Sequence, residues 1–117
     1  MNSQQLPPIA AEYLRSINDQ LPNDFAALFV EDAVVQDAGR EYRGLPAIRK
    51  WGDTDIYQPR VALHPLEVAA RGDGVKLTTR VEGNFDRTGL PDPVIIQHSL
   101  TLRGDRIAKL VCELAPA

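Results

Sequence analysis

The sequence has little of several features that define whole classes of protein. One cysteine among 117 residues excludes an internal disulfide, and the two histidines show none of the ligand spacings of a zinc site. No apolar run approaches the roughly 18 residues of a transmembrane helix. Lys and Arg total 13 against 16 Asp and Glu, without a basic tract, so neither a nucleic-acid partner nor a membrane partner is expected.

Several catalytic and targeting signatures are absent as well. The sequence has no glycine-rich phosphate loop and no serine or cysteine nucleophile motif, so we expect no bound nucleotide, cofactor or metal. Residues 1–5 lack the basic stretch that begins a signal peptide. Together with the unpaired cysteine, this favours a reduced, cytoplasmic location.

What is present is an ordinary composition for one globular domain. At this mass, folding hides roughly two-thirds of the surface of the unfolded chain, enough for one core and one pocket. We therefore expect a single domain over residues 1–117. Only 6% of the residues are aromatic, so each aromatic side chain is expected to serve the core or a pocket.

The first half of the sequence predicts helices separated by a short hairpin. Pro7-Pro8 opens a helix over 8–19, and Asn23 is expected to cap a short second helix. Their apolar faces comprise Ile9, Tyr13, Leu14 and Ile17 in the first helix, and Phe25, Leu28 and Phe29 in the second. The patterns then predict, in order, a strand over 33–37, a turn at Ala38-Gly39, a strand over 40–43, a helix from Leu45 to about Gly52, and a loop over 53–59.

The second half changes to strand periodicity. Strands are predicted over 60–70, 75–85, 94–103 and 106–114, and Pro65 indicates either a bulge or an edge strand. The apolar rows that should face the core are Val75, Leu77, Thr79, Val81, Gly83 and Phe85, and then Val94, Ile96, His98, Leu100 and Leu102. Helices followed by long antiparallel strands predict an α+β fold with a cavity between sheet and helices.

These patterns resemble the NTF2-like superfamily, and most closely its SnoaL-like members. The resemblance runs through Phe25-Ala26-Ala27-Leu28-Phe29-Val30-Glu31-Asp32-Ala33-Val34-Val35-Gln36-Asp37, Tyr42-Arg43-Gly44 and Ala47-Ile48-Arg49. It implies a cone, in which a strongly curved mixed sheet wraps around three helices. Ketosteroid isomerases and SnoaL-like cyclases share this cone, and members of the superfamily are usually dimeric.

The resemblance also implies a set of site residues. Asp37 matches the base of ketosteroid isomerases, and Tyr13 matches the tyrosine that donates a hydrogen bond to the developing oxyanion. Where those isomerases carry a second aspartate, this chain has His98, or Gln97 after a shift of one residue. We favour His98 because it shares the apolar row of its strand. We expect the ligand to contact Trp51, Tyr42, Phe29 and Leu100.

Each candidate also has a structural interpretation. Tyr13 fits a core tyrosine with a satisfied hydroxyl, and Asp37 fits a residue that satisfies turn backbone groups. His98 fits a hydrogen-bonded core histidine. Cys112 is interpreted as small core filling.

Two functions follow from these alternatives. The first is a cofactor-independent isomerase, cyclase or dehydratase that acts on a small hydrophobic molecule, with Asp37 as base, Tyr13 as donor and His98 as acid or polariser. The second is a ligand-binding or dimeric interaction module without catalysis. In either case we expect a homodimer through the outward sheet face that carries Arg80, Glu82 and Gln97.

Overall fold

Each of the three α-helices begins with a proline in its first turn, where the missing amide hydrogen costs nothing. The computed structural model describes residues 6–116, so residues 1–5, on which the expectation about a signal peptide rested, lie outside it. The elements in chain order are α1 (Pro8–Asn18), α2 (Pro22–Ala27), β1 (Phe29–Asp37), β2 (Arg40–Arg43), α3 (Leu45–Gly52), the π-helical turn η1 (Asp53–Tyr57), β3 (Ala62–Arg71), β4 (Gly74–Glu82), β5 (Ile95–Arg103) and β6 (Arg106–Leu114).

Three local predictions were wrong. Asn23 is not a cap: Leu21 is at the cap position, so the second helix starts at Pro22, two residues earlier than predicted, and the Asn23 side chain accepts a hydrogen bond from Arg49. Phe29 lies at the start of β1 rather than on a helix, so that strand is four residues longer than predicted. Residues 53–57 form a π-helical turn that continues α3, where a loop was expected.

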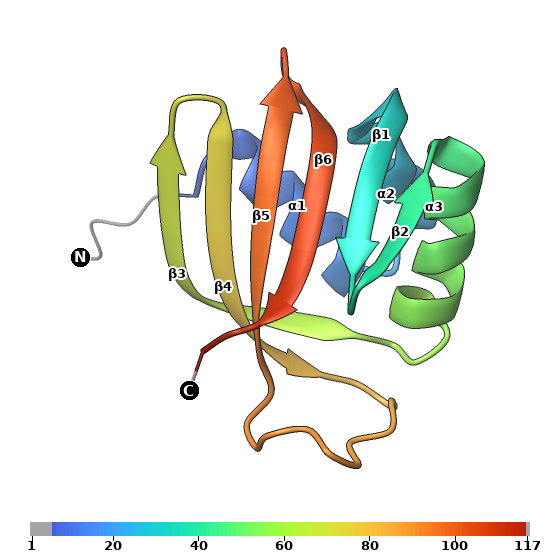
Figure 1. Cartoon of the computed structure of the whole chain (residues 1–117), viewed down its shortest axis with the longest axis vertical. Helices are drawn as coiled ribbons and strands as arrows, with labels where there is room; N and C mark the ends of the chain where they lie inside the picture. The colour runs from blue at the N-terminus through green and yellow to red at the C-terminus, as the bar shows by residue number, and fades with distance from the viewer. Residues whose placement is uncertain (1–5, 117) are drawn as a thin grey trace.

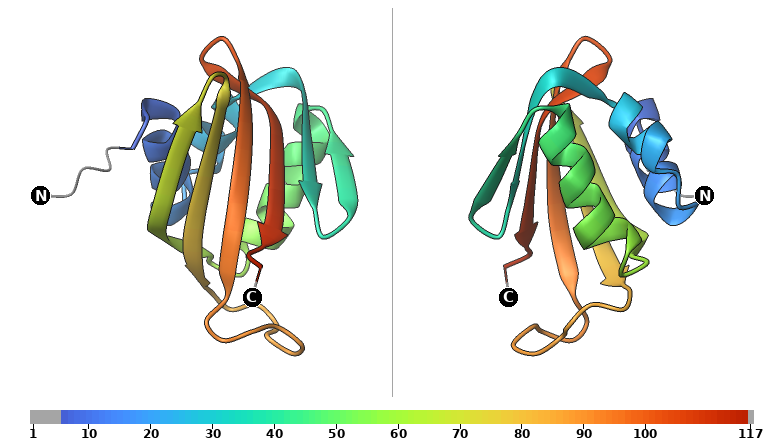
Figure 2. Two further views of the ribbon diagram at one scale, coloured as in Figure 1. Left: turned by 60° about the vertical axis from the view of Figure 1, so that its left-hand side comes forward. Right: turned by 90° about the vertical axis from the view of Figure 1, so that its right-hand side faces the viewer.

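The strands form one mixed sheet in the order β2-β1-β6-β5-β4-β3. Neighbouring strands are antiparallel except for β1 and β6, which run parallel. The sheet is curved but not closed, and the three α-helices lie on one of its faces (Figures 1 and 2). This arrangement confirms the expected α+β fold and its NTF2-like architecture.

The helices cover opposite ends of the curved sheet. Helix α1 packs on β3 through its buried face, which includes Tyr13 and Ile17. Helix α3 packs on β1 and β2, with Ile48 and Trp51 buried. The middle strands β4, β5 and β6 therefore pass behind a space that lies between the two helices.

Alternation along the strands decides what faces that space. On β4 the buried row is Val75, Leu77, Thr79 and Val81, as predicted, but the strand ends at Glu82, so Gly83 and Phe85 do not continue it. The predicted irregularity in β3 is also present, because its register with β4 shifts between Pro65 and Glu67. His98 is 5% exposed and belongs to the inward row of β5.

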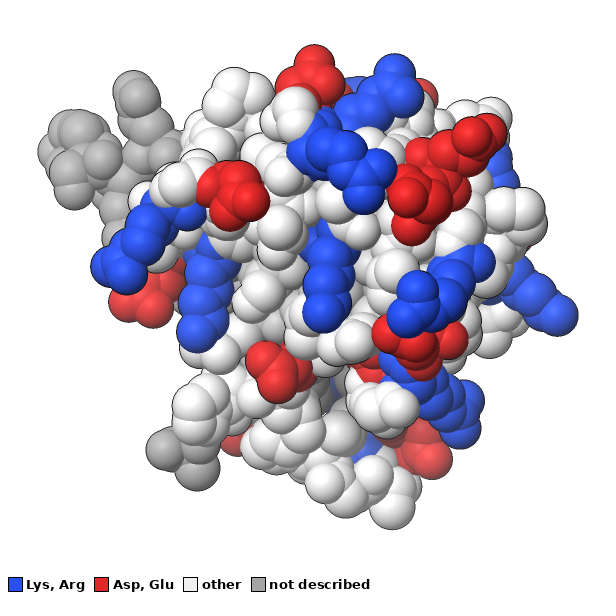
Figure 3. Space-filling view, turned by 45° about the horizontal axis from the view of Figure 1, so that its top comes forward, with Lys and Arg blue, Asp and Glu red and all other residues white. Residues whose placement is uncertain are grey.

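Most charged side chains lie on the outer surface. Figure 3 shows positive and negative side chains interspersed over one face of the molecule. Arg15 pairs with both Glu12 and Asp24 at 2.8 Å, and Arg103 pairs with Asp32 at 2.9 Å. None of the helices within residues 6–116 is both long enough and apolar enough to cross a bilayer.

Candidate functional site

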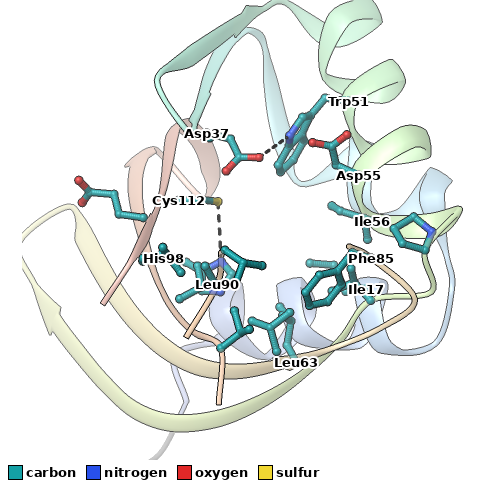
Figure 4. Close-up of a pocket in the computed structure, with 18 of the residues that line it drawn as sticks. Ile17, Asp37, Trp51, Asp55, Ile56, Leu63, Phe85, Leu90, His98 and Cys112 are labelled. Carbon is teal, nitrogen blue, oxygen red and sulfur yellow. Dashed lines mark hydrogen bonds between the residues drawn. The ribbon is translucent and has the colours of Figure 1, made fainter. Parts of the chain in front are cut away.

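A cavity of about 910 Å³ opens between the concave face of the sheet and the helices (Figure 4). Its walls come from α1, from the α3–η1 segment, from five strands (β1, β3, β4, β5 and β6) and from the loop over 83–94. Most of the lining is apolar, including Ile17, Ile56, Leu63, Val81, Phe85 and Leu90. A mainly apolar hollow with a few polar groups is the usual form of a small-molecule site.

Three polar groups of the cavity come from one row across the sheet. In the strand register His98 of β5 is opposite Cys112 of β6, and Cys112 is opposite Asp37 of β1. All three residues line the cavity, and so does Tyr13, which enters from α1. The structure therefore brings the three predicted catalytic residues to one space, from three separate elements.

Tyr13 and His98 are in direct contact. The Tyr13 hydroxyl lies 2.8 Å from His98 Nδ1, and the Thr79 hydroxyl lies 2.9 Å from His98 Nε2. Thr79 is fully buried, and Tyr13 is 1% exposed. Both ring nitrogens of the imidazole are thus hydrogen-bonded to neutral hydroxyls.

Burial determines the charge of these groups. It lowers the pKa of His98 from 6.5 to about 4, so the imidazole is neutral at neutral pH. Burial is also the main cause that raises the pKa of Tyr13 well above 10, with smaller contributions from Cys112, Asp37 and Tyr57. The pair is therefore a neutral phenol beside a neutral imidazole.

Asp37 is placed by the end of β1. The next two residues, Ala38 and Gly39, have φ angles of 52° and 78°, as the tight type I′ turn between β1 and β2 requires. Trp51 Nε1 donates a hydrogen bond to Asp37 Oδ2 at 3.1 Å, shown as a dashed line in Figure 4. One carboxylate oxygen is thus held in place by the indole, and the other accepts no hydrogen bond from any residue between 6 and 116.

A second carboxyl, which the sequence analysis missed, lies close to Asp37. Asp55 lines the cavity from η1, and Figure 4 shows its side chain beside the Trp51 indole. Its pKa is raised, first by burial and then by the charge of Asp37. No sequence signal distinguished Asp55 from the other residues of the predicted loop over 53–59.

Cys112 was expected to fill the core, but it faces the cavity. Its sulfur lies 3.9 Å from His98 Nδ1 (Figure 4). Burial raises the pKa of the thiol far above its ordinary value, so Cys112 is a protonated thiol at neutral pH.

Of the four residues expected to contact a ligand, only Trp51 lines the cavity. Phe29 is 1% exposed, because it packs in the core with its ring 5.0 Å from that of Phe25. Leu100 is also 1% exposed and faces the core further along β5. Tyr42 lies on β2, where its ring is 6.1 Å from that of Trp51, so it supports the wall instead of forming it.

The charged side chains that line the cavity are all acidic. The acidic residues are Asp37, Asp55, Asp86 and Glu113, and none of the described lining residues is Lys or Arg. Across residues 6–116, no three His, Cys, Asp or Glu side chains are grouped so that they could hold a metal ion.

Comparison with known proteins identifies a family and several similar structures. The family model for the SnoaL-like domain matches residues 10–110. A candidate polyketide cyclase from Sinorhizobium meliloti is 28% identical, with a TM-score of 0.84, over 97% of this chain and all of that one. A protein from Sphaerobacter thermophilus is 26% identical, with a TM-score of 0.72, over 93% and 94% of the two chains.

A more distant structure shares the fold. It is a Catenulispora acidiphila protein with a ketosteroid isomerase-like fold, solved with trimethylamine, and it is 23% identical with a TM-score of 0.76. The match covers 93% of this chain and 86% of that one. Among curated proteins, none matches this sequence.

Proposed function

Because the chain belongs to the SnoaL-like domain family, we propose that its cavity binds a small, largely apolar molecule and rearranges it by cofactor-independent acid/base chemistry. One observation carries the proposal: Asp37, Tyr13 and His98 come from three separate elements and line one apolar cavity. A core tyrosine or a turn aspartate needs no such space. The similarity to a candidate polyketide cyclase supports the same class of chemistry.

Asp37 is the proposed base. The Trp51 indole holds Oδ2, which fixes the plane of the carboxylate and leaves Oδ1 to take a proton from a carbon atom of the ligand. Asp37 is half-buried at the edge of the cavity, where a bound ligand would cover the carboxylate. A base of this kind acts on a C–H bond next to a carbonyl group, because the resulting charge can move to the carbonyl oxygen.

Tyr13 is the proposed donor to that oxygen. A phenol in a dry cavity stabilises developing negative charge better than water does, because its dipole is already oriented. His98 contacts Tyr13 at 2.8 Å and stays neutral, so of the two roles expected for it we retain the polariser and drop the imidazolium acid.

The lining also restricts the charge of the ligand. Besides burial, the charge of Asp37 raises the pKa of Asp55, and Arg40 opposes this from outside the cavity, whereas no described lining residue is Lys or Arg. A carboxylate or phosphate on the ligand would be repelled by about 1–3 kcal/mol at the separations and effective dielectric constants usual in such sites. We therefore propose a neutral ligand that carries a carbonyl group.

Deuterium exchange tests the proposal without knowledge of the natural product. A panel of small cyclic ketones is incubated with the protein in D₂O, and NMR follows deuterium incorporation next to the carbonyl. The wild type should accelerate exchange. The exchange rate should fall by about 10²–10⁴-fold in Asp37→Asn and by about 10²–10³-fold in Tyr13→Phe. If both variants keep the wild-type rate, the assignment is wrong.

Matched controls separate chemistry from folding. Asp105→Asn changes an exposed aspartate between β5 and β6, and Tyr42→Phe removes a hydroxyl outside the cavity lining. Both variants should keep the wild-type exchange rate. A ketone that raises the melting temperature but exchanges no faster than in buffer would instead establish the non-catalytic binding module.

A further inference from the structure

Thr79 is a polar residue in an otherwise apolar row. Its neighbours in the row on β4 are Leu77 and Val81, and its side chain is fully buried behind the cavity. Leu77 is directly opposite His98 in the strand register, so Thr79 is the diagonal neighbour of the imidazole on the same face. A valine would fill this position equally well, so the hydroxyl has a role other than packing.

The hydroxyl has one hydrogen-bond partner among the described residues, His98 Nε2 at 2.9 Å. Ser16, also fully buried, behaves differently, because it donates to the backbone oxygen of Tyr13. Thr79 makes no such backbone bond. Its hydroxyl hydrogen therefore either points at Nε2 or has no acceptor in the described structure.

The two tautomers of His98 differ in which hydroxyl hydrogen loses the imidazole as its acceptor, that of Thr79 or that of Tyr13, and only Tyr13 lines the cavity. A neutral imidazole carries one N–H, so one ring nitrogen donates and the other accepts. If Nε2 carried the hydrogen, Thr79 would accept it and leave its own buried hydroxyl hydrogen unpaired, which should cost at least about tenfold in the tautomer ratio. If Nδ1 carries it, Thr79 donates to Nε2, His98 donates to the Tyr13 oxygen, and the Tyr13 hydrogen can point into the cavity that Tyr13 lines.

We propose that Thr79 is a positioning residue that fixes His98 as the Nδ1–H tautomer, so that the Tyr13 hydroxyl accepts from His98 and keeps its own hydrogen for a ligand in the cavity. In the opposite tautomer the Tyr13 hydroxyl would donate that hydrogen to Nδ1 of His98. Cys112, with its sulfur 3.9 Å from Nδ1, is a weak partner beside the Tyr13 oxygen at 2.8 Å. The claim that Tyr13 donates to a ligand rests on the proposed function, whereas the claim that His98 is the Nδ1–H tautomer does not.

The tautomer can be read directly in the free protein. Long-range ¹H–¹⁵N correlation spectra of protein labelled with ¹⁵N-histidine distinguish protonated from unprotonated ring nitrogens, and His64 is the only other histidine in the sequence. At neutral pH the wild type should show His98 protonated at Nδ1 and unprotonated at Nε2, in a ratio above about tenfold. A wild-type spectrum with the hydrogen on Nε2 overturns the proposal.

Two variants test whether Thr79 is responsible. Thr79→Ser keeps the hydroxyl and should keep the Nδ1–H tautomer, whereas Thr79→Val keeps the shape and should reduce the tautomer ratio at least severalfold. An unchanged ratio in Thr79→Val shows that another group sets the tautomer and also overturns the proposal. If Thr79→Val does not fold, the wild-type spectrum still decides the direction, and a loss of Nδ1–H in Thr79→Ser contradicts the role of the hydroxyl.

The ketone exchange assay separates this proposal from the proposed function. With both correct, Thr79→Val should slow exchange at saturating ketone while changing the half-saturating concentration little, and Thr79→Ser should restore the rate. An Nδ1–H tautomer in a protein that exchanges no ketone refutes the proposed function and leaves the assignment of Thr79 intact. If the protein exchanges the ketone but carries the Nε2–H tautomer, the proposed function stands and the assignment of Thr79 is refuted.

Discussion

Mild acid should destabilise this protein through His98. Burial lowers the pKa of His98 from 6.5 to about 4 in the folded protein, whereas the unfolded chain protonates the same side chain near pH 6.5. Between these values the unfolded state binds more protons than the folded state, so the free energy of unfolding falls as the pH falls. The contribution of His98 is intact above pH 6.5 and is lost below about pH 4.

The size of the effect follows from the two pKa values. For a single site that titrates near 6.5 when unfolded and near 4 when folded, a change from pH 7 to pH 5 lowers the free energy of unfolding by about 2 kcal/mol. Carboxyl groups with ordinary pKa values titrate mostly below this window. Small domains have about 5–15 kcal/mol of stability in total, so the loss is large enough to measure.

Urea unfolding followed by circular dichroism at pH 7 and pH 5 measures this loss. His98→Gln keeps a polar side chain that cannot be protonated, so its free energy of unfolding should change by about 2 kcal/mol less than that of the wild type over this interval. His64→Gln is the matched control, because His64 is half exposed outside the cavity, and the loss should persist in that variant. Equal wild-type stability at both pH values, or an undiminished loss in His98→Gln, refutes the reasoning.

Three further predictions concern packing and assembly. Gly83→Ala places a Cβ 3.0 Å from the Pro59 backbone oxygen, whereas the Cβ of Gly72→Ala meets nothing within 4 Å. Gly83→Ala should therefore lower the free energy of unfolding by about 1–3 kcal/mol more than Gly72→Ala. Urea unfolding midpoints compare the two variants, and equal losses of stability contradict the contact argument. Leu100→Ala should lower the free energy of unfolding by about 2–5 kcal/mol, because Leu100 lies in the core and not in the cavity wall; a variant of unchanged stability would show the side chain to be dispensable. The expected homodimer should give twice the chain mass by light scattering at micromolar concentration, and a charge reversal at Arg80 should reduce that mass if the outward sheet face is the interface.

The strands of the second half could be predicted because their period is short and exact. Successive side chains of a strand point to opposite faces, so the apolar row with Leu100 favoured His98 over Gln97 as the inward residue, and His98 is indeed buried. The corresponding row of β4 contained Thr79. Its role escaped the sequence analysis because the contact with His98 is diagonal between strands, and only the strand register reveals it.

The wrong predictions share a different physical cause. Asp55 lies on a short π-helical turn, which has neither the period of a strand nor that of an α-helix, so nothing in residues 53–59 marked it. Phe29 and Leu28 continued the apolar spacing of the second helix, but strand pairing of β1 begins at Phe29, opposite Ile107 of β6. Which elements pair across such a separation is decided by tertiary contacts, which local propensity does not contain.

The parallel pairing of β1 with β6 also determines when the cavity can form during folding. Asp37 is synthesised early, yet the residue beside it in the sheet is Cys112, near the end of the last of the six strands. Parallel strands so far apart in sequence require the closure of a long loop, which makes their pairing slow compared with the formation of hairpins. The β3–β4 hairpin can assemble from neighbouring segments, whereas Asp37 reaches His98 and Tyr13 only after β6 has docked. A nascent chain that lacks β6 should therefore contain folded hairpins but no ligand site.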